Sequence, residues 1–210
     1  MGDTHRYTTL GVGVTGGIGS GKTEACRIFE SFGLRVLYAD TIARNLIDTD
    51  EQIRRSVRRL FGDGIYLDSG LDRKEVAKRI FADEDLQKKL NAIVHPVVLN
   101  AIDGELRSAR GRGEEHIVMV EAALMFESGA DRMLDYTVLI DAEQEHRVSR
   151  VVQRDHSNRT EVMQRIKAQL PVSEKARRAD FIIQNNGTRD ELTRKCEFIY
   201  NVLCRIAEGK

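Results

Sequence analysis

Short apolar runs alternate with stretches of helical periodicity along most of this 210-residue chain. Five runs have the length of buried strands, namely Leu10–Val14, Arg35–Tyr38, Ile117–Val120, Thr137–Ile140 and Phe181–Ile183. The periodicity predicts helices between them, including Thr23–Phe32, Glu143–Asp155 and Arg189–Ile206. Buried strands separated by helices are typical of a parallel sheet with helices on both faces. The pattern therefore predicts an α/β fold of three layers with a five-stranded parallel sheet.

One long stretch interrupts this alternation. From about Thr41 to Arg110 the pattern predicts three or four helices and no clear strand. Because this stretch lies between the second and third strands, we expect it to be a helical insertion that caps a site.

Composition and charge narrow the possible functions. Lys and Arg total 33, and so do Asp and Glu, so the formal net charge is zero and lacks the basic excess of a nucleic-acid binder. No apolar run approaches the roughly 20 residues of a membrane span, and the first residues lack a secretory signal. The three cysteines lack metal-site spacing and are predicted to be reduced thiols. We expect a cytoplasmic protein, monomeric or a weak homo-oligomer, with small-molecule substrates and neither nucleic acid nor membrane as partner.

A glycine-rich segment carries the clearest chemical signal. Residues 16–23 read GGIGSGKT and fit the pattern G-x-x-x-x-G-K-[ST] between a predicted strand and a predicted helix. In such a P-loop, backbone N–H groups and the helix N-terminus cradle phosphate oxygens. The predicted nucleotide-binding residues are Gly17, Ile18, Gly19, Ser20, Gly21, Lys22 and Thr23. Lys22 would reach the outer phosphates and the Thr23 hydroxyl would ligate Mg²⁺. A glycine-rich turn without function fits this strand–loop–helix context poorly, so we predict that the loop binds a nucleoside triphosphate.

The P-loop class can be subdivided from the remaining sequence. A GTPase would show Asp-x-x-Gly after a strand and Asn-Lys-x-Asp for guanine, and neither string occurs. A nucleic-acid motor would normally be longer and more basic. A small-molecule kinase instead needs a carboxylate near the acceptor hydroxyl and arginines that offset phosphate charge.

Carboxylates stand at the ends of two predicted strands. Asp40 follows the second strand and would lie beside the phosphate-binding loop in a parallel sheet, where it could accept or orient a hydroxyl proton. The alternative is that Asp40 only caps the helix that begins at Thr41. Glu121 ends the third strand and could act as an outer ligand of Mg²⁺, although it could equally be a surface acid.

Arginines gather late in the chain. Arg147, Arg150 and Arg154 are spaced by three and four residues on one predicted helix, so they share a face. A polar stretch follows and then another helix, an arrangement suited to a mobile lid over transferring phosphates. A solvated charged face is the alternative.

Several segments together resemble the dephospho-CoA kinase family over nearly the whole chain. They are GVTGGIGSGKT, VLYADTIAR, LDRKEVAKRIFAD, LNAIVHPVV, EAALMFESG, RVVQRD, RIKAQLPVSEK and ADFIIQNNG. The resemblance implies ATP-dependent phosphorylation of the ribose 3′-hydroxyl of dephospho-CoA, the last step of coenzyme A synthesis. It also implies a P-loop NTPase core (about residues 8–40, 116–145 and 178–210), a helical substrate-binding insertion (about 41–110) and a lid (about 146–175).

The resemblance also assigns roles to individual residues. Asp40 would be the general base, with Lys22 and the lid residue Arg154 as the other catalytic groups. The residues implied on the acceptor side are Asp40, Arg44, Asp72, Arg73 and His95, followed in the lid by Arg165. Arg150, Asn185 and Gly187 would contact the nucleotide, the last two at adenine.

Three positions depart from the family pattern. Tyr38 replaces an acidic residue, Ala123 replaces a proline, and Arg147 stands where glutamine is frequent. None of these departures touches the phosphate-binding loop or Asp40.

Two other functions are compatible with the loop. One is a kinase of the same superfamily that phosphorylates a nucleoside monophosphate. The other is a non-catalytic ATP-binding protein whose lid gates a partner surface. The intact Lys22, Thr23 and Asp40 disfavour the second, and a screen of acceptors distinguishes the first.

Overall fold

The computed structural model describes residues 9–113 and 115–209, which form two compact units. The first unit holds the described residues up to Tyr38 and those from Glu105 onward, and the second is Ala39–Gly104. The lid boundaries and the substrate-binding role of the insertion stay predictions.

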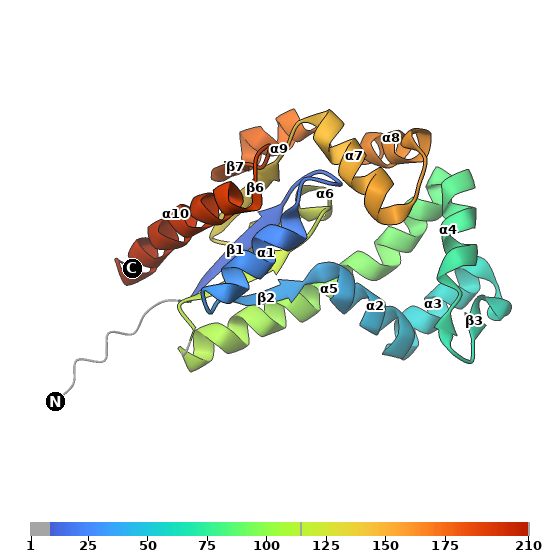
Figure 1. The fold of residues 1–210 in the computed structure, drawn as a ribbon. Coiled ribbons are helices and arrows are strands. Elements are labelled where there is room, and N and C mark those ends of the chain that lie inside the picture. The colour runs from blue at the N-terminus through green and yellow to red at the C-terminus, as the bar shows by residue number, and fades with distance from the viewer. Residues whose placement is uncertain (1–8, 114, 210) are drawn as a thin grey trace. The chain divides into compact units, whose positions relative to one another are not determined.

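A five-stranded parallel sheet is the centre of the first unit (Figure 1). Its strands are β1 (Leu10–Thr15), β2 (Arg35–Tyr38), β5 (Ile117–Glu121), β6 (Tyr136–Asp141) and β7 (Phe181–Gln184). The predicted α/β fold is confirmed, and each predicted strand agrees with the observed one within one residue at each end. The sheet order is β2-β5-β1-β6-β7, so β5 lies between β1 and β2. Chain order therefore does not set strand order in this parallel sheet, and the position of Asp40 beside the phosphate-binding loop stays a prediction.

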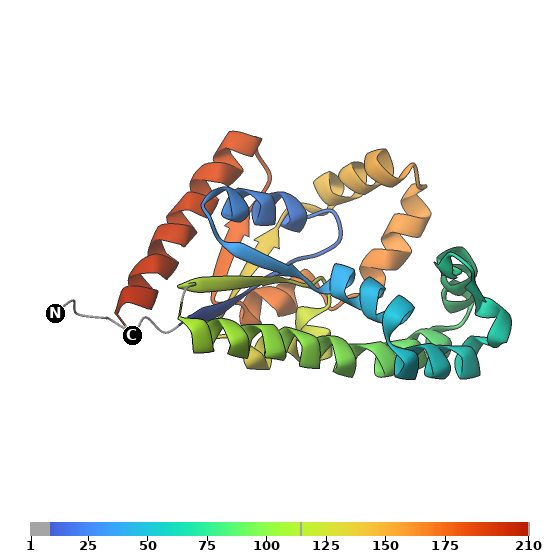
Figure 2. The ribbon, with the colours of Figure 1, turned by 90° about the horizontal axis from the view of Figure 1, so that it is seen from below.

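Helices cover both faces of this sheet, as Figures 1 and 2 show. On one face lie α1 (Lys22–Ser31) and α10 (Arg189–Glu208), and the end of α5 (Glu84–Arg112) lies on the other. The remaining elements of this unit are α6 (Met125–Ser128), η2 (Ala130–Met133), α7 (Gln144–Asp155), α8 (Arg159–Lys167) and α9 (Val172–Arg178).

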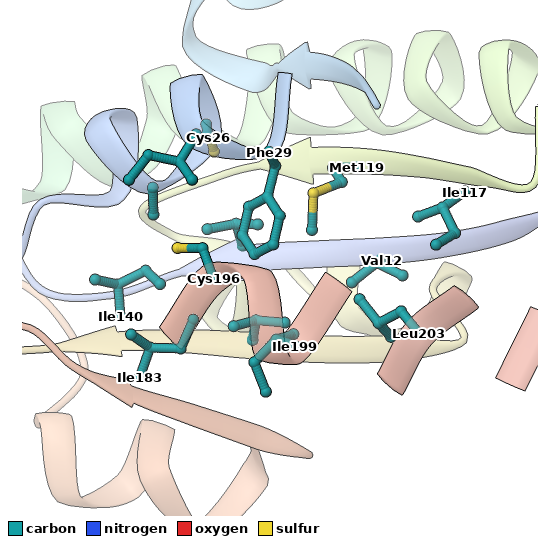
Figure 3. Packing of buried hydrophobic residues seen from close by; sticks show 14 of the residues in the cluster. Val12, Cys26, Phe29, Ile117, Met119, Ile140, Ile183, Cys196, Ile199 and Leu203 are labelled. Atoms are coloured by element: carbon teal, nitrogen blue, oxygen red, sulfur yellow. The ribbon is translucent and has the colours of Figure 1, made fainter. Parts of the chain in front are cut away.

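The main core fills the space between the sheet and the helices α1 and α10 (Figure 3). Val12, Phe29, Met119 and Leu203 are fully buried there, and their removal from water stabilises the fold. Cys196 is buried in the same cluster, and burial raises the pKa of its thiol to about 12. This thiol therefore stays protonated and packs as a small apolar side chain.

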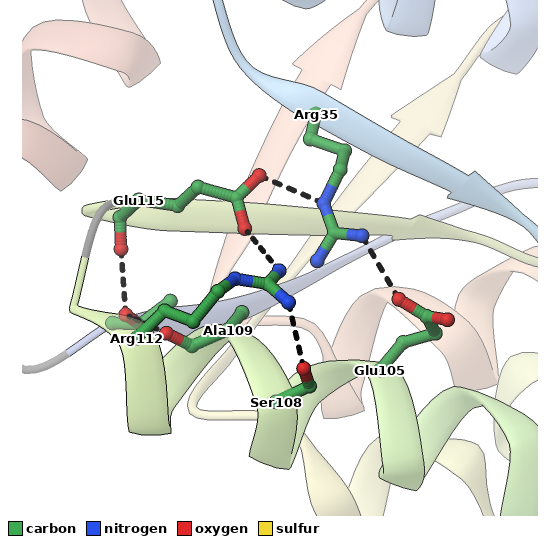
Figure 4. Close-up of polar contacts among 7 residues, drawn as sticks. Arg35, Glu105, Ser108, Ala109, Arg112 and Glu115 are labelled. Atoms are coloured by element: carbon green, nitrogen blue, oxygen red, sulfur yellow. Dashed lines mark hydrogen bonds and ion pairs between the residues drawn. The ribbon is translucent and has the colours of Figure 1, made fainter.

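A polar network joins β2 to the segment between α5 and β5 (Figure 4). The Arg35 guanidinium forms ion pairs with Glu115 at 2.8 Å and with Glu105 at 3.0 Å. Arg112 donates a hydrogen bond to the Ser108 hydroxyl and lies 3.7 Å from Glu115. These partly exposed pairs add little stability individually, but together they fix the edge strand β2 against its neighbours.

The second unit is mostly helical. It contains α2 (Ala39–Thr49), α3 (Glu51–Phe61), η1 (Asp63–Ile65), β3 (Tyr66–Leu67), β4 (Gly70–Leu71), α4 (Arg73–Ala82) and the first part of α5. The expectation of no strand here is wrong, because β3 and β4 form a short antiparallel hairpin. Two-residue strands are too short to show an alternating pattern in the sequence. Asp48 holds the hairpin by accepting a 3.1 Å hydrogen bond from the Leu71 N–H.

Within the described ranges, we find no helix that combines the length and the apolar character needed to cross a membrane.

Candidate active site

The phosphate-binding loop connects β1 to α1 at the carboxyl end of the sheet. Gly21 precedes α1 with φ of 97°, a left-handed conformation that glycine adopts readily, and no side chain caps the helix start. The first N–H groups of α1 are thus available to an anion. The Lys22 ammonium lies along the loop and donates hydrogen bonds to the carbonyls of Gly16 (3.1 Å) and Gly17 (3.4 Å). The buried Ser20 hydroxyl has no hydrogen-bond partner within the described residues, as expected where a ligand supplies one.

The two residues predicted to hold Mg²⁺ lie on elements next to the loop, and their role as ligands stays a prediction. Thr23 lies in the exposed first turn of α1, and Glu121 is the buried last residue of β5. Glu121 pairs in register with Val14 of β1, the strand that leads into the loop. Residues 9–113 and 115–209 contain no cluster of three or more acidic, His or Cys ligands. A site with one or two protein oxygens suits Mg²⁺, which keeps phosphate and water ligands.

Helix α7 and the turn after β7 contact one end of the loop. Asn185 is buried, and its side-chain amide donates a 2.8 Å hydrogen bond to the Ser20 carbonyl. Arg150 donates to the Asn185 carbonyl at 2.9 Å and lies 3.5 Å from the carbonyls of Gly19 and Ser20. The structure thus brings these two predicted residues to the loop. Their contact with the nucleotide stays a prediction, as does that of Gly187, which lies against the Glu191 carboxylate at the start of α10.

Arg147 occupies a position that the sequence did not indicate. Arg147 is buried at 6% exposure, and Nη1 lies where a Cβ on Gly17 would point, so a side chain at position 17 would displace the guanidinium. Nε has no hydrogen-bond partner among the described residues. Burial lowers the pKa of the guanidinium, and the nearby charge of Asp141 partly opposes that shift.

Arg154 and Arg165 both bind the carboxylate of Asp155, not that of Asp141. Arg154 donates two hydrogen bonds to Asp155, at 2.7 and 3.1 Å, and Arg165 donates a third at 3.0 Å. The hydrogen bonds from Arg154, followed by the single one from Arg165, hold the pKa of Asp155 at about 2. The three arginines of α7 therefore have different surroundings, although their spacing predicts a common face. The catalytic role of Arg154 and the substrate-binding role of Arg165 stay predictions.

A connector between α8 and α9 also contacts the loop, through residues to which the sequence assigns no role. The Gln169 side-chain oxygen accepts a 3.2 Å hydrogen bond from the Ile18 N–H. The next residue, Leu170, donates its N–H to the Glu127 carboxylate at 2.9 Å. Glu127 also pairs at 2.9 Å with the fully buried Lys175, whose ammonium donates to the Ala123 carbonyl at 2.8 Å. These residues lie in the segments EAALMFESG and RIKAQLPVSEK, which match the family pattern. The match does not indicate which of their side chains meet.

The Glu127–Lys175 pair yields a stability prediction. We expect Glu127→Gln to lower the free energy of unfolding by about 3 kcal/mol, because it leaves a buried ammonium without its counter-charge. Urea unfolding at neutral pH measures the change. The control is Glu174→Gln, which removes an exposed carboxylate of α9 that lies 4.0 Å from Arg177. Equal stability of the two variants would contradict the prediction.

Apart from Arg165, the predicted acceptor residues lie in the second unit. Arg73 donates to Asp48 at 2.7 Å and to the Arg44 carbonyl at 3.3 Å, and Asp72 accepts the Glu75 N–H at 3.0 Å as the N-cap of α4. The structure thus brings Arg73 to the backbone of Arg44, whereas the Asp72 side chain serves as a helix cap. His95 is half-buried in α5. Substrate binding by these residues stays a prediction.

Asp40 is an exposed residue in the first turn of α2. Because α2 begins at Ala39 rather than at Thr41, Asp40 does not cap the helix. Tyr38 stands two residues before Asp40, where it ends β2 and packs against the main core. Burial raises the pKa of the Tyr38 phenol, so this side chain stays neutral and cannot replace the acidic residue expected there.

Comparison with known proteins identifies this architecture. A dephospho-CoA kinase from Campylobacter jejuni has a similar structure, with a TM-score of 0.70, 25% identity and coverage of 96% of this chain and 98% of that one. A shikimate kinase from Acinetobacter baumannii shares the fold, with a TM-score of 0.54, 16% identity and 95% coverage of both chains. The fold and the phosphate-binding loop define a P-loop kinase.

The family model described as dephospho-CoA kinase matches residues 10–191. A dephospho-CoA kinase from Geobacter sulfurreducens is 40% identical over 190 residues, which cover 90% of this chain and 96% of that protein. The chain belongs to the dephospho-CoA kinase family.

Proposed function

We propose that this kinase transfers the γ-phosphoryl group of ATP to the ribose 3′-hydroxyl of dephospho-CoA, which gives coenzyme A and ADP. The observation that carries the proposal is an intact phosphate-binding loop in a chain that belongs to this family over most of its length. The three cysteines are free thiols, which suits the cytoplasm as the compartment.

The loop residues would hold and polarise the nucleotide. The N–H groups at the start of α1 bind phosphate oxygens, and Lys22 exchanges its contacts with the Gly16 and Gly17 carbonyls for contacts with the outer phosphates. Mg²⁺, held by the Thr23 hydroxyl with Glu121 behind it, would neutralise phosphate charge. Arg150 and Asn185 would border the adenosine.

Asp40 would accept the proton of the 3′-hydroxyl, or orient that hydroxyl for in-line attack. The carboxylate stands two residues beyond the end of β2, and ligands of open parallel sheets bind outside the carboxyl ends of the strands. Arg44, Asp72, Arg73 and His95 would bind the acceptor, and Arg154 and Arg165 would approach the transferring group from the lid.

A coupled assay of ADP release tests the proposal. Purified protein is incubated with ATP and Mg²⁺, with and without dephospho-CoA, and the products are analysed by mass spectrometry. We expect ADP only in the presence of dephospho-CoA, together with a product heavier by one phosphoryl group. Turnover with a nucleoside monophosphate instead would show that dephospho-CoA is not the acceptor. The absence of turnover with every acceptor would favour a non-catalytic ATP-binding protein.

A further inference from the structure

The buried guanidinium of Arg147 lies beside the loop with unused hydrogen-bonding capacity. The side chain is 6% exposed, and its Nε finds no hydrogen-bond acceptor among the described residues. A buried charge without hydrogen bonds is costly, and proteins normally pair such a group. Asp141 acts on Arg147 only through its charge, while its carboxylate accepts a 3.1 Å hydrogen bond from the Gln184 amide. An anion that binds beside Arg147 would compensate the cost.

The position of Arg147 along the loop indicates which part of a nucleotide it would meet. Nη1 lies against Gly17, and the Lys22 ammonium is held at the carbonyls of Gly16 and Gly17. In a P-loop this lysine serves the β- and γ-phosphates. The two cations therefore converge on the same end of the loop.

Arg150 and Asn185 mark the opposite end. They contact the carbonyls of Gly19 and Ser20, and the Asn185 amide lies where a Cβ on Gly21 would point. Two arginines of helix α7, Arg147 and Arg150, thus contact different parts of the loop. One arginine already has carbonyl partners, whereas Arg147 has an unpaired Nε.

We propose that Arg147 binds the terminal phosphate of the nucleoside triphosphate and thereby distinguishes ATP from ADP. The proposal rests on the proposed function, since it assumes that the loop binds a nucleotide. A guanidinium offers several N–H donors in a plane, a geometry suited to two oxygens of one phosphate. The γ-phosphate is also the group that transfers, so Arg147 would offset charge on it during the reaction.

Calorimetric titration without acceptor tests this inference. The ligands are β,γ-imido-ATP and ADP, each with Mg²⁺, and the proteins are wild type, Arg147→Gln and Arg147→Lys. We expect Arg147→Gln to raise the Kd for β,γ-imido-ATP by about tenfold or more, and the Kd for ADP by less than about threefold, because one charged hydrogen-bonded contact is lost only from the terminal phosphate. Arg147→Lys should lie between wild type and Arg147→Gln, because it keeps the charge and loses the planar donors.

Folding is controlled separately. Ligand-free Arg147→Gln should unfold at a temperature no lower than wild type, because the substitution removes a buried unpaired charge. Arg177→Gln, on an exposed face of α9, is the matched control and should bind both nucleotides like wild type. If Arg147→Gln does not fold, the comparison of the two ligands with Arg147→Lys decides the question.

Two results would overturn the inference while the proposed function stands. One is unchanged binding of both nucleotides by the Arg147 variants, and the other is an equal loss for β,γ-imido-ATP and ADP. If wild type binds neither nucleotide, the proposed function fails, and the role of Arg147 fails with it.

Discussion

Replacement of Asp40 by alanine is expected to lower kcat by about a thousandfold and to change the Kd for ATP by less than about threefold. The carboxylate would act on the acceptor hydroxyl, whereas the phosphates are held by the loop and Lys22. Its loss therefore removes the alignment and deprotonation of the attacking oxygen, and nucleotide binding remains. The structural cost is small, because Asp40 is exposed and contributes to α2 mainly through the helix dipole, about 0.3–1 kcal/mol.

Steady-state kinetics with dephospho-CoA measures this effect, and calorimetry measures ATP binding by the same variant. Asp85→Ala is the control, because Asp85 is a highly exposed carboxylate of the second unit that pairs only loosely with Lys88, at 3.4 Å. Retention of most of the rate by Asp40→Ala would show that the base is another residue. A fall in rate together with a large loss of ATP affinity would show that Asp40 takes part in nucleotide binding.

Replacement of Lys22 by alanine is expected to damage both binding and rate. The ammonium donates hydrogen bonds to the carbonyls of Gly16 and Gly17. Lys22 is the only lysine of the loop, and its charge would bind the outer phosphates. We expect the Kd for ATP to rise by about a hundredfold and kcat to fall by at least as much, because a charged contact is lost in the ground state and another in the transition state.

The same two measurements separate Lys22→Ala from Asp40→Ala. Lys88→Ala, which removes an exposed lysine of α5, should behave like wild type in both. A Lys22→Ala variant with a normal Kd for ATP would contradict the prediction that the loop binds the nucleotide phosphates through this residue.

The sequence predicted the sheet well because its three central strands, β1, β5 and β6, are buried on both faces, and all five strands stand out as short apolar runs. It also predicted the phosphate-binding loop, where glycine spacing, Lys22 and the following helix report one local geometry. The order of the strands was not predictable, since the position of β5 between β1 and β2 depends on packing between distant segments. The hairpin at Tyr66–Leu71 was missed because each strand has only two residues.

The candidate site shows the same division. Arg150 and Asn185 were predicted from their motifs, and the structure places both at the loop. Arg147 looked equivalent to its helical neighbours, because spacing shows a shared face but not which side chains are buried. Gln169 and the Glu127–Lys175 pair depend on side chains that meet backbone groups far away in the sequence. No local pattern encodes such contacts.

The connector held by Gln169 and Glu127 has a mechanical consequence for the segment predicted to be the lid. Arg150 ties α7 to the Asn185 carbonyl and, at 3.5 Å, to the loop carbonyls of Gly19 and Ser20, and the connector is tied at the other end of that segment. Between these two tethers lies α8, whose side-chain ion pairs are made with Glu145 and Asp155 of α7. Val162 of α8 is also buried against Val148 and Val151 of α7, so the two helices form one packed pair between the tethers. Exchange of deuterium into the backbone amides of Arg159–Lys167 should accordingly keep pace with exchange in Gln144–Asp155, because the two helices would open together.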